Sequence, residues 1–236
     1  MPPPVGNIIT TITMTMTTTT TDPRAILRLL AWLSPAFPTG AFAYSHGLEW
    51  AVEAGDISDG DTLQCWLLDI LRHGTGWTDT ILLRHAHRAA DNAATLADIA
   101  ALARATAASR ERQAEALDQG RAFALAASAW NKPHLPPDPP YPVAVGALTG
   151  AHGIAEDDAA AAYLQSFTAN LISAAVRLVP LGQTAGLRVL AALEPVILAT
   201  AAATRNATLD DIGGCAFRAD LAAMRHETQY TRLFRS

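Results

Sequence analysis

One pair of residues in the chain, His226-Glu227, begins a known catalytic pattern. In zinc proteases a helix carries His-Glu and a second histidine four residues after the first, so that both imidazoles reach one metal ion. Position 230 is Tyr, so this spacing is not met. The sequence also contains no Gly-x-Ser-x-Gly turn, the form in which many hydrolases present a nucleophile. These residues therefore give no positive indication of a hydrolase.

A second group, His46, Glu49 and Glu53, falls on one face of an expected helix and could hold a metal ion. A solvated polar face explains the same spacing, and we favour that interpretation. Lys132 is the only lysine, and it lacks the glycine frame of a Walker phosphate-binding loop. We therefore predict no bound metal, no cofactor and no nucleotide hydrolysis by this chain.

The last twenty residues carry instead the chemistry of a protein interface. Arginine and aromatic side chains anchor many interfaces, whereas a chain terminus normally frays. We expect the final apolar pair to be exposed and to become ordered against a partner. On composition alone, a helix that closes the protein's own core and is followed by loose residues explains the segment equally well. The residues concerned are Phe217, Leu221, Met224 and Thr228 in an apolar stripe, then Arg225, Tyr230, Arg232, Leu233, Phe234 and Arg235.

Helix signals recur along the chain, and no stretch alternates over the length of a strand. Asp22-Pro23 is a cap residue followed by proline at the first helical position, and Ser109 is placed to begin a long helix. Glu156-Asp157-Asp158 puts three acids at the favourable end of a helix dipole. Residues 1–22 are a Thr-rich tail for which we expect disorder. We predict an all-α fold, a single globular domain of about ten helices over residues 23–236.

A stiff loop, residues 34–49, follows the first expected helix. Two prolines and a glycine limit its backbone freedom, and Phe37, Phe42 and Tyr44 give it apolar mass. A preorganised loop loses little entropy on binding. We therefore predict that its first part, up to His46, is rigid and faces a partner.

Composition limits the classes of function. Half of the residues are hydrophobic and 17% are charged, with a net charge of −5, so we expect a folded chain that does not bind nucleic acid. No basic region precedes an apolar run at the N-terminus, and polar residues interrupt the uncharged stretch 159–176. We expect neither a signal peptide nor a membrane span. Cys65 and Cys215 form no CxxC pair, and we expect them to be reduced core residues of a cytoplasmic protein.

Five blocks of the sequence resemble, in order, the UreF family of urease accessory proteins. Together they span most of residues 24–236. The chain departs from the family pattern at Gly40-Ala41, where a Gly pair is usual, and at Ala43, where Ser is usual. These departures concern local loop geometry. The blocks are residues 34–49, Arg110-Glu111 with Gln119-Gly120-Arg121, Tyr141-Pro142-Val143 with Gly146, residues 173–183, and residues 224–236.

The resemblance implies an all-α protein without catalysis of its own. It implies a homodimeric scaffold that joins the accessory protein UreD, also called UreH, and the GTPase UreG on apo-urease, where nickel is delivered to the active site. Partner-binding residues are then expected in the stiff loop, in the block 173–183 and at the C-terminus. They are Tyr44, His46, Arg177, Arg225, His226, Glu227, Tyr230, Arg232, Leu233, Phe234 and Arg235.

Two other functions stay open. An arginine supplied to another protein's active site can stabilise charge during phosphoryl transfer, so the chain could regulate the UreG GTPase through Arg177. A structural ion pair between Arg177 and an acidic neighbour is the alternative that we favour. An α-helical hydrolase is the third possibility, and it would require activity from the isolated protein.

Overall fold

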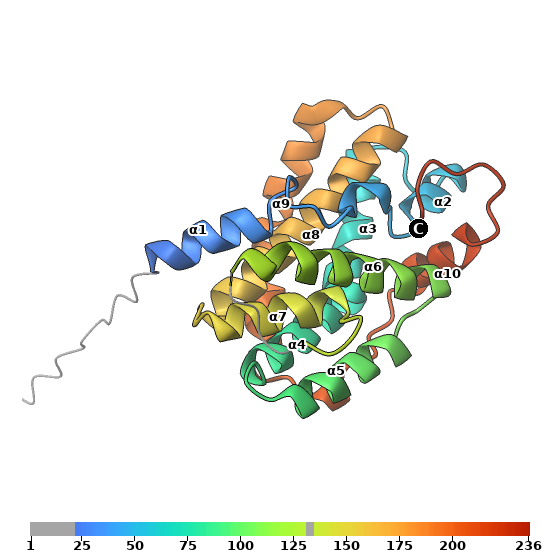
Figure 1. The fold of residues 1–236 in the computed structure, drawn as a ribbon. Coiled ribbons are helices and arrows are strands. Elements are labelled where there is room, and N and C mark those ends of the chain that lie inside the picture. The colour runs from blue at the N-terminus through green and yellow to red at the C-terminus, as the bar shows by residue number, and fades with distance from the viewer. Residues whose placement is uncertain (1–21, 131–134) are drawn as a thin grey trace, which may run out of the picture.

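The structure, a computed structural model, describes residues 22–130 and 135–236. These residues form ten α-helices and four short 3₁₀ turns, without a β-strand among them (Figure 1). The predicted all-α fold is confirmed, whereas the expected disordered tail falls, apart from Asp22, outside the described residues. The α-helices are α1 (Pro23–Trp32), α2 (Leu48–Glu53), α3 (Gly60–His73), α4 (Thr75–Arg88), α5 (Ala93–Ala105), α6 (Arg110–Ala126), α7 (Tyr141–Ala151), α8 (Glu156–Leu178), α9 (Gly182–Ala203) and α10 (Phe217–His226).

Local signals set several helix ends as the sequence predicted. The Asp22 carboxylate accepts a hydrogen bond from a backbone N–H in the first turn of α1, and Pro23 follows it. The Ser109 hydroxyl caps α6 by accepting a hydrogen bond from the N–H of Arg112 at 3.1 Å. Glu156 opens α8 with two further acids in the same turn. These caps satisfy N–H groups that have no partner inside their own helix.

Two helix pairs make the most extensive helix contacts among the described residues (Figure 1). Helix α4 runs along α7, α8 runs along α9, and α3 contacts both α4 and α9. The last helix, α10, rests on α2 and on α6. Helix α1 extends from the side of the molecule and contributes only Ala25 and Trp32 as buried residues. This arrangement brings the C-terminal segment onto the stiff loop and the short helix that follows it.

Glycines permit the closest helix contact. A methyl group added at Gly146 on α7 would overlap the carbonyl oxygen of Leu83 on α4, and one at Gly150 would overlap the carbonyl oxygen of His87. Both glycines lie on the same side of α7, one helical turn apart. The two helices can therefore pack backbone against backbone along this line.

Helix α9, with the 3₁₀ turn that follows it, is long and apolar enough to cross a membrane, judged by length and composition alone. Its inner face is part of the core, where Val189, Leu193 and Ile197 are buried against α3 and α8. We interpret it as a core helix. The helix continues through Pro195, which the sequence suggested could kink it or begin a new helix.

The prediction that both cysteines are core residues is wrong, because Cys65 and Cys215 are exposed. On α3 the buried stripe runs through Leu63, Trp66 and Leu67, and Cys65 falls outside it. The prediction relied on the apolar neighbours of Cys65 in the sequence. The helical period places Cys65 itself on the exposed side of α3.

We expect Gly146→Ala to lower the free energy of unfolding by about 1–3 kcal/mol, because the added methyl group forces α7 away from Leu83. Gly60→Ala is the matched control. Its methyl group would lie 3.7 Å from a methyl carbon of Val189, at a helix start that tolerates alanine, so no loss is expected. Urea denaturation followed by circular dichroism measures both variants. Equal losses from the two substitutions would contradict the close-packing account.

Candidate partner-binding surface

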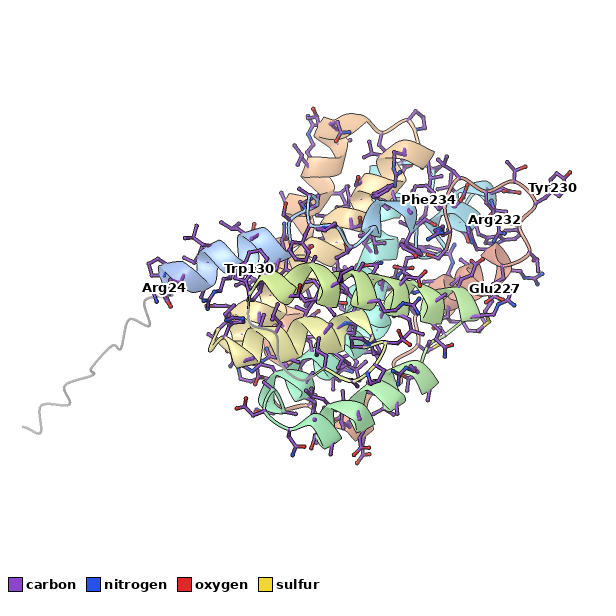
Figure 2. The ribbon with its side chains drawn as sticks, in the orientation of Figure 1. Arg24, Trp130, Glu227, Tyr230, Arg232 and Phe234 are labelled. Carbon is purple, nitrogen blue, oxygen red and sulfur yellow. The ribbon has the colours of Figure 1, made fainter. Side chains whose placement is uncertain are left out.

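After α10 the chain turns back on itself in an extended segment, residues 227–236, which we call the C-terminal strap. Figure 2 shows it reaching outward at Tyr230 and returning toward the body at Phe234, and its end lies beside α2 in Figure 1. The N–H of Arg235 donates a hydrogen bond to the carbonyl oxygen of Ala43 at 2.8 Å. The strap is therefore attached to the stiff loop and is part of the fold.

Glu49, on α2, holds the middle of the strap. Its Oε1 accepts a hydrogen bond from the N–H of Leu233 at 2.6 Å, and its Oε2 accepts one from the N–H of Phe234 at 2.9 Å. The carboxylate is buried, and these charge-assisted bonds offset part of the cost of removing it from water. The interpretation of Glu49 as part of a solvated face is wrong, because the strap covers it.

His226, the last residue of α10, lies between two carboxylates. Its Nδ1 is 2.6 Å from Oε2 of Glu111 on α6, and its Nε2 is 3.2 Å from Oε2 of Glu49. Oε1 of Glu111 accepts a hydrogen bond from Nη1 of Arg232 on the strap at 2.7 Å. His226 is fully buried, so it cannot touch a partner directly, although it was expected among the contact residues.

Phe234 was expected to be exposed, and this prediction is wrong. Only 4% of its surface is accessible, and the side chain belongs to the main core. The guanidinium of Arg177 lies over its ring, 4.2 Å from the centroid, and donates a hydrogen bond to the carbonyl oxygen of Phe42 at 2.5 Å. Arg177 therefore does not form the ion pair with an acidic neighbour that we favoured. Its guanidinium contacts both the strap and the stiff loop and so links them.

The final residue, Ser236, is buried under the loop. Its carbonyl oxygen accepts a hydrogen bond from the N–H of Ser45 at 2.8 Å, and its hydroxyl donates to Glu115 at 2.6 Å. Burial alone would raise the pKa of Glu115, but the neighbouring Arg112 guanidinium and the bonds around it hold that pKa at about 2. The last residue of the strap is thus hydrogen-bonded to the Glu115 carboxylate, which stays charged.

Tyr44 and His46 support the loop from beneath and are buried. The Tyr44 hydroxyl donates a hydrogen bond to Asp118 at 2.9 Å, and burial followed by this bond raises its pKa. Nε2 of His46 lies 3.0 Å from the Thr75 hydroxyl, and burial followed by the charge of Arg112 lowers the pKa of His46 to about 4. Both residues were expected at a partner contact, but their side chains position the loop and do not reach solvent.

Other residues of the last twenty are exposed, some on α10 and some on the strap. The buried face of α10 consists mainly of alanines. Its bulky apolar residues therefore face outward, and Phe217 is 71% accessible. Gly47 allows this close approach, because a methyl group there would lie 2.7 Å from the backbone nitrogen of Ala223. We call the exposed group the C-terminal surface. It consists of Phe217, Leu221, Met224, Arg225, Tyr230, Arg232, Leu233 and Arg235.

Glu227 is oriented differently from the rest of that group. Its Oε1 accepts a hydrogen bond from the N–H of Arg110 at 2.8 Å, so it caps the start of α6. Glu227 therefore joins the end of α10 to the start of α6.

A second exposed apolar site lies at the other end of the strap. Phe42 in the loop and Leu125 on α6 are 70% and 77% accessible. They line a hollow of about 670 Å³ together with Arg121 and Arg235. The predicted partner-facing loop thus presents Phe42, rather than Tyr44, to solvent.

A separate cavity of about 520 Å³ lies between α1, the stiff loop and α8. Asp79, at its lining, accepts a hydrogen bond from the Tyr163 hydroxyl at 2.7 Å. Burial raises the pKa of Asp79 to about 6, although that bond alone would lower it. The sequence did not predict that Asp79 lines a cavity. It also did not predict that Glu49 and Glu111 flank His226.

Comparison with known proteins gives a consistent result. A model of the UreF family matches residues 57–194. A protein of Bradyrhizobium sp. BTAi1 named urease accessory protein UreF is 55% identical over 224 residues, which cover 91% of this chain and 93% of that protein. Proteins of the same name from Mesorhizobium japonicum and Brucella ovis are 53% and 49% identical, and cover 90% and 98% of this chain. The alignments cover 96% and 100% of those relatives.

We expect Phe234→Ala to destabilise the protein by about 3 kcal/mol, because it empties a core position beneath Arg177. Leu233→Ala is the matched control on the neighbouring residue, which is 67% accessible, and it should change stability by no more than about 0.5 kcal/mol. Thermal unfolding of the purified chain separates them. If both substitutions were neutral, the strap would not be packed as described.

Asp79 should make stability fall as pH rises. The pKa of Asp79 is about 6 in the folded chain, above its ordinary value of 3.8, so between these values the folded state binds more protons than the unfolded state. Stability contributed by the neutral carboxyl is present below about pH 4 and is lost through about pH 6. Asp79→Asn should remove this dependence and be the more stable form at pH 7.5, by on the order of 1 kcal/mol. A difference between the two chains that does not vary from pH 4 to pH 7 would contradict the assignment.

Proposed function

The chain belongs to the UreF family of urease accessory proteins, and on that premise we propose that it is a non-catalytic adaptor that joins UreD (UreH) and the GTPase UreG on apo-urease. In this role it supports nickel insertion without itself carrying out a reaction. We further propose that it acts in the cytoplasm as a homodimer, as the family resemblance implies. The relatives' names support the urease context, and the surfaces of the chain support the role of an adaptor.

The observation that carries the proposal is the C-terminal surface. Phe217, Leu221 and Met224 expose 71%, 42% and 49% of their areas on one face of α10. A helix normally buries such a stripe, and an exposed one marks a site of interaction. Because the strap beside it is held by Glu49 and packed by Phe234, the surface is largely preorganised. Little conformational entropy would then be lost when a partner binds.

Arginine side chains on this surface can orient a bound partner. Arg225, next to Met224 on α10, is exposed, and so are Arg232 and Arg235 on the strap, where Arg232 is also bonded to Glu111. Arginine can bind a carboxylate through two parallel hydrogen bonds, which fixes the register of an otherwise apolar contact. We propose that UreD docks here, with acidic groups opposite the arginines.

An adaptor needs more than one such surface. The hollow lined by Phe42 and Leu125 offers a second apolar site with charged neighbours. Tyr44 and His46 hold the loop that forms it, so their contribution to a partner complex is to position that loop. We propose that this hollow serves another component of the urease complex.

The alternative, a regulator that inserts Arg177 into the UreG active site, has less support. Arg177 already lies over the Phe234 ring and is bonded to the carbonyl oxygen of Phe42. Its release would remove contacts that hold strap and loop together. The adaptor role requires no such rearrangement.

The test of the proposed UreD site is a single charge on the apolar stripe. Met224→Glu should weaken UreD binding about tenfold or more, because it places a charge in the centre of an apolar contact. Leu187→Glu, at a residue on α9 that is 65% accessible, is the matched control and should leave binding unchanged. Affinity is measured by titration with purified UreD, and circular dichroism verifies that both variants fold. Undiminished binding by Met224→Glu would refute this assignment of the surface.

A further inference from the structure

Three side chains from distant parts of the sequence form a buried row. His226 stands in the middle, with Glu111 on its Nδ1 side at 2.6 Å and Glu49 on its Nε2 side at 3.2 Å. The imidazole is 0% accessible, and the two carboxylates are 14% and 10% accessible. No bulk water can therefore replace either contact.

The row needs a proton that a neutral ring and two carboxylates do not supply. A neutral imidazole donates from one nitrogen and accepts at the other, whereas a carboxylate only accepts. With the ring neutral, one of the two contacts would set a lone pair against a charged oxygen. An added proton on the ring makes both contacts hydrogen bonds.

Both carboxylates of the row also hold the strap. Glu49 accepts the N–H groups of Leu233 and Phe234, and Glu111 accepts the guanidinium of Arg232. A repulsive contact at His226 would push one of these carboxylates away from its strap partner. Strap attachment and the extra proton are therefore coupled through the same oxygen atoms.

We infer that the C-terminal strap is a proton-dependent latch, closed when the Glu111–His226–Glu49 row holds its extra proton and loosened when that proton is lost. The latch controls how firmly the C-terminal surface is presented. Only this last consequence rests on the proposed function, because the latch itself concerns contacts within one chain.

Two buried groups of the same region, His46 and Glu115, do not supply a competing switch. His46, whose backbone N–H is bonded to Ser236, has its pKa lowered by burial to about 4 and stays neutral over the physiological range. Glu115, with a pKa of about 2, stays charged. Other charged groups from the elements packed around α10 are Glu53 on α2, Arg110 and Arg112 on α6, Arg225 and Glu227 at the end of α10, and Arg232 on the strap.

The direction of the pH effect follows from the proton count. The latched state binds one proton more than the loosened state, so rising pH favours loosening. Above the pH at which the proton is lost, the opening equilibrium should rise by up to about tenfold per pH unit.

One substitution removes the need for the proton. In Glu111→Gln the amide oxygen can still accept from Arg232, while the amide nitrogen can donate to Nδ1 of a neutral His226, whose Nε2–H then donates to Glu49. This variant should keep the strap latched at all pH values between 5.5 and 8.5. Glu53→Gln is the matched control, since Glu53 binds Gln229 of the strap but lies outside the row.

Hydrogen exchange of the Leu233 and Phe234 amides in the full chain measures the latch. Comparison of variants at the same pH cancels the intrinsic pH dependence of exchange. Protection in the wild-type chain should fall relative to Glu111→Gln, by up to about tenfold per pH unit, and Glu53→Gln should behave as wild type. A ratio that stays constant with pH would overturn the proposal, and so would a Glu111→Gln chain that is unprotected throughout.

A substitution of His226 itself tests whether the strap depends on the extra proton. His226→Gln presents one donor and one acceptor at any pH, so its strap should be loose at pH 5.5 as well as at pH 8.5. Wild-type protection in this variant would overturn the latch.

UreD titrations at pH 6 and pH 8 separate the two proposals. Absence of UreD binding at both pH values would refute the docking site while leaving a pH-responsive strap intact, whereas equal binding by wild type and Glu111→Gln at pH 8 would refute control of docking by the latch.

Discussion

The carboxylate of Glu49 is the constraint on which the C-terminal half of the candidate site depends. It is buried, and it makes contacts with two strap N–H groups and with His226. The strap takes this carboxylate out of water, and the N–H groups of Leu233 and Phe234 offset that desolvation cost by hydrogen bonding to it. These hydrogen bonds tie the end of the chain to α2. The outward position of Leu233 agrees with this attachment, since the N–H group of this residue faces inward to Glu49.

Close approach of small residues makes this arrangement possible. Gly47 and the alanines of α10 let that helix lie directly on α2, which brings His226 to Glu49 and leaves the bulky side chains of α10 outside. The same device joins α4 to α7 at Gly146. In both places the small residues decide which face of a helix is buried. The large apolar residues of α10 are therefore available to a partner, and the adaptor proposal depends on this inversion.

The sequence predicted those features that local chemistry determines. The helical class, the cap at Asp22 and the acidic start of α8 depend on residues within one turn of each other. The burial of Phe234 and the row around His226 could not be predicted, because Glu111 and Glu49 lie 115 and 177 positions from His226. A local pattern cannot show that a terminal segment returns to cover a buried acid. The resemblance named Glu49 and Glu111 only as members of motifs and gave neither a structural role.

The central claim is that the isolated chain already holds its C-terminus in place. Ser236 is 1% accessible, and its hydroxyl and carbonyl groups are both bonded. Digestion of the purified chain with a carboxypeptidase, followed by mass spectrometry, tests this directly, because the enzyme requires a free terminus. We expect Ser236 and Arg235 to be retained long after a peptide of residues 225–236 has lost them. Removal of both residues from the folded chain at the rate seen for the peptide would contradict it.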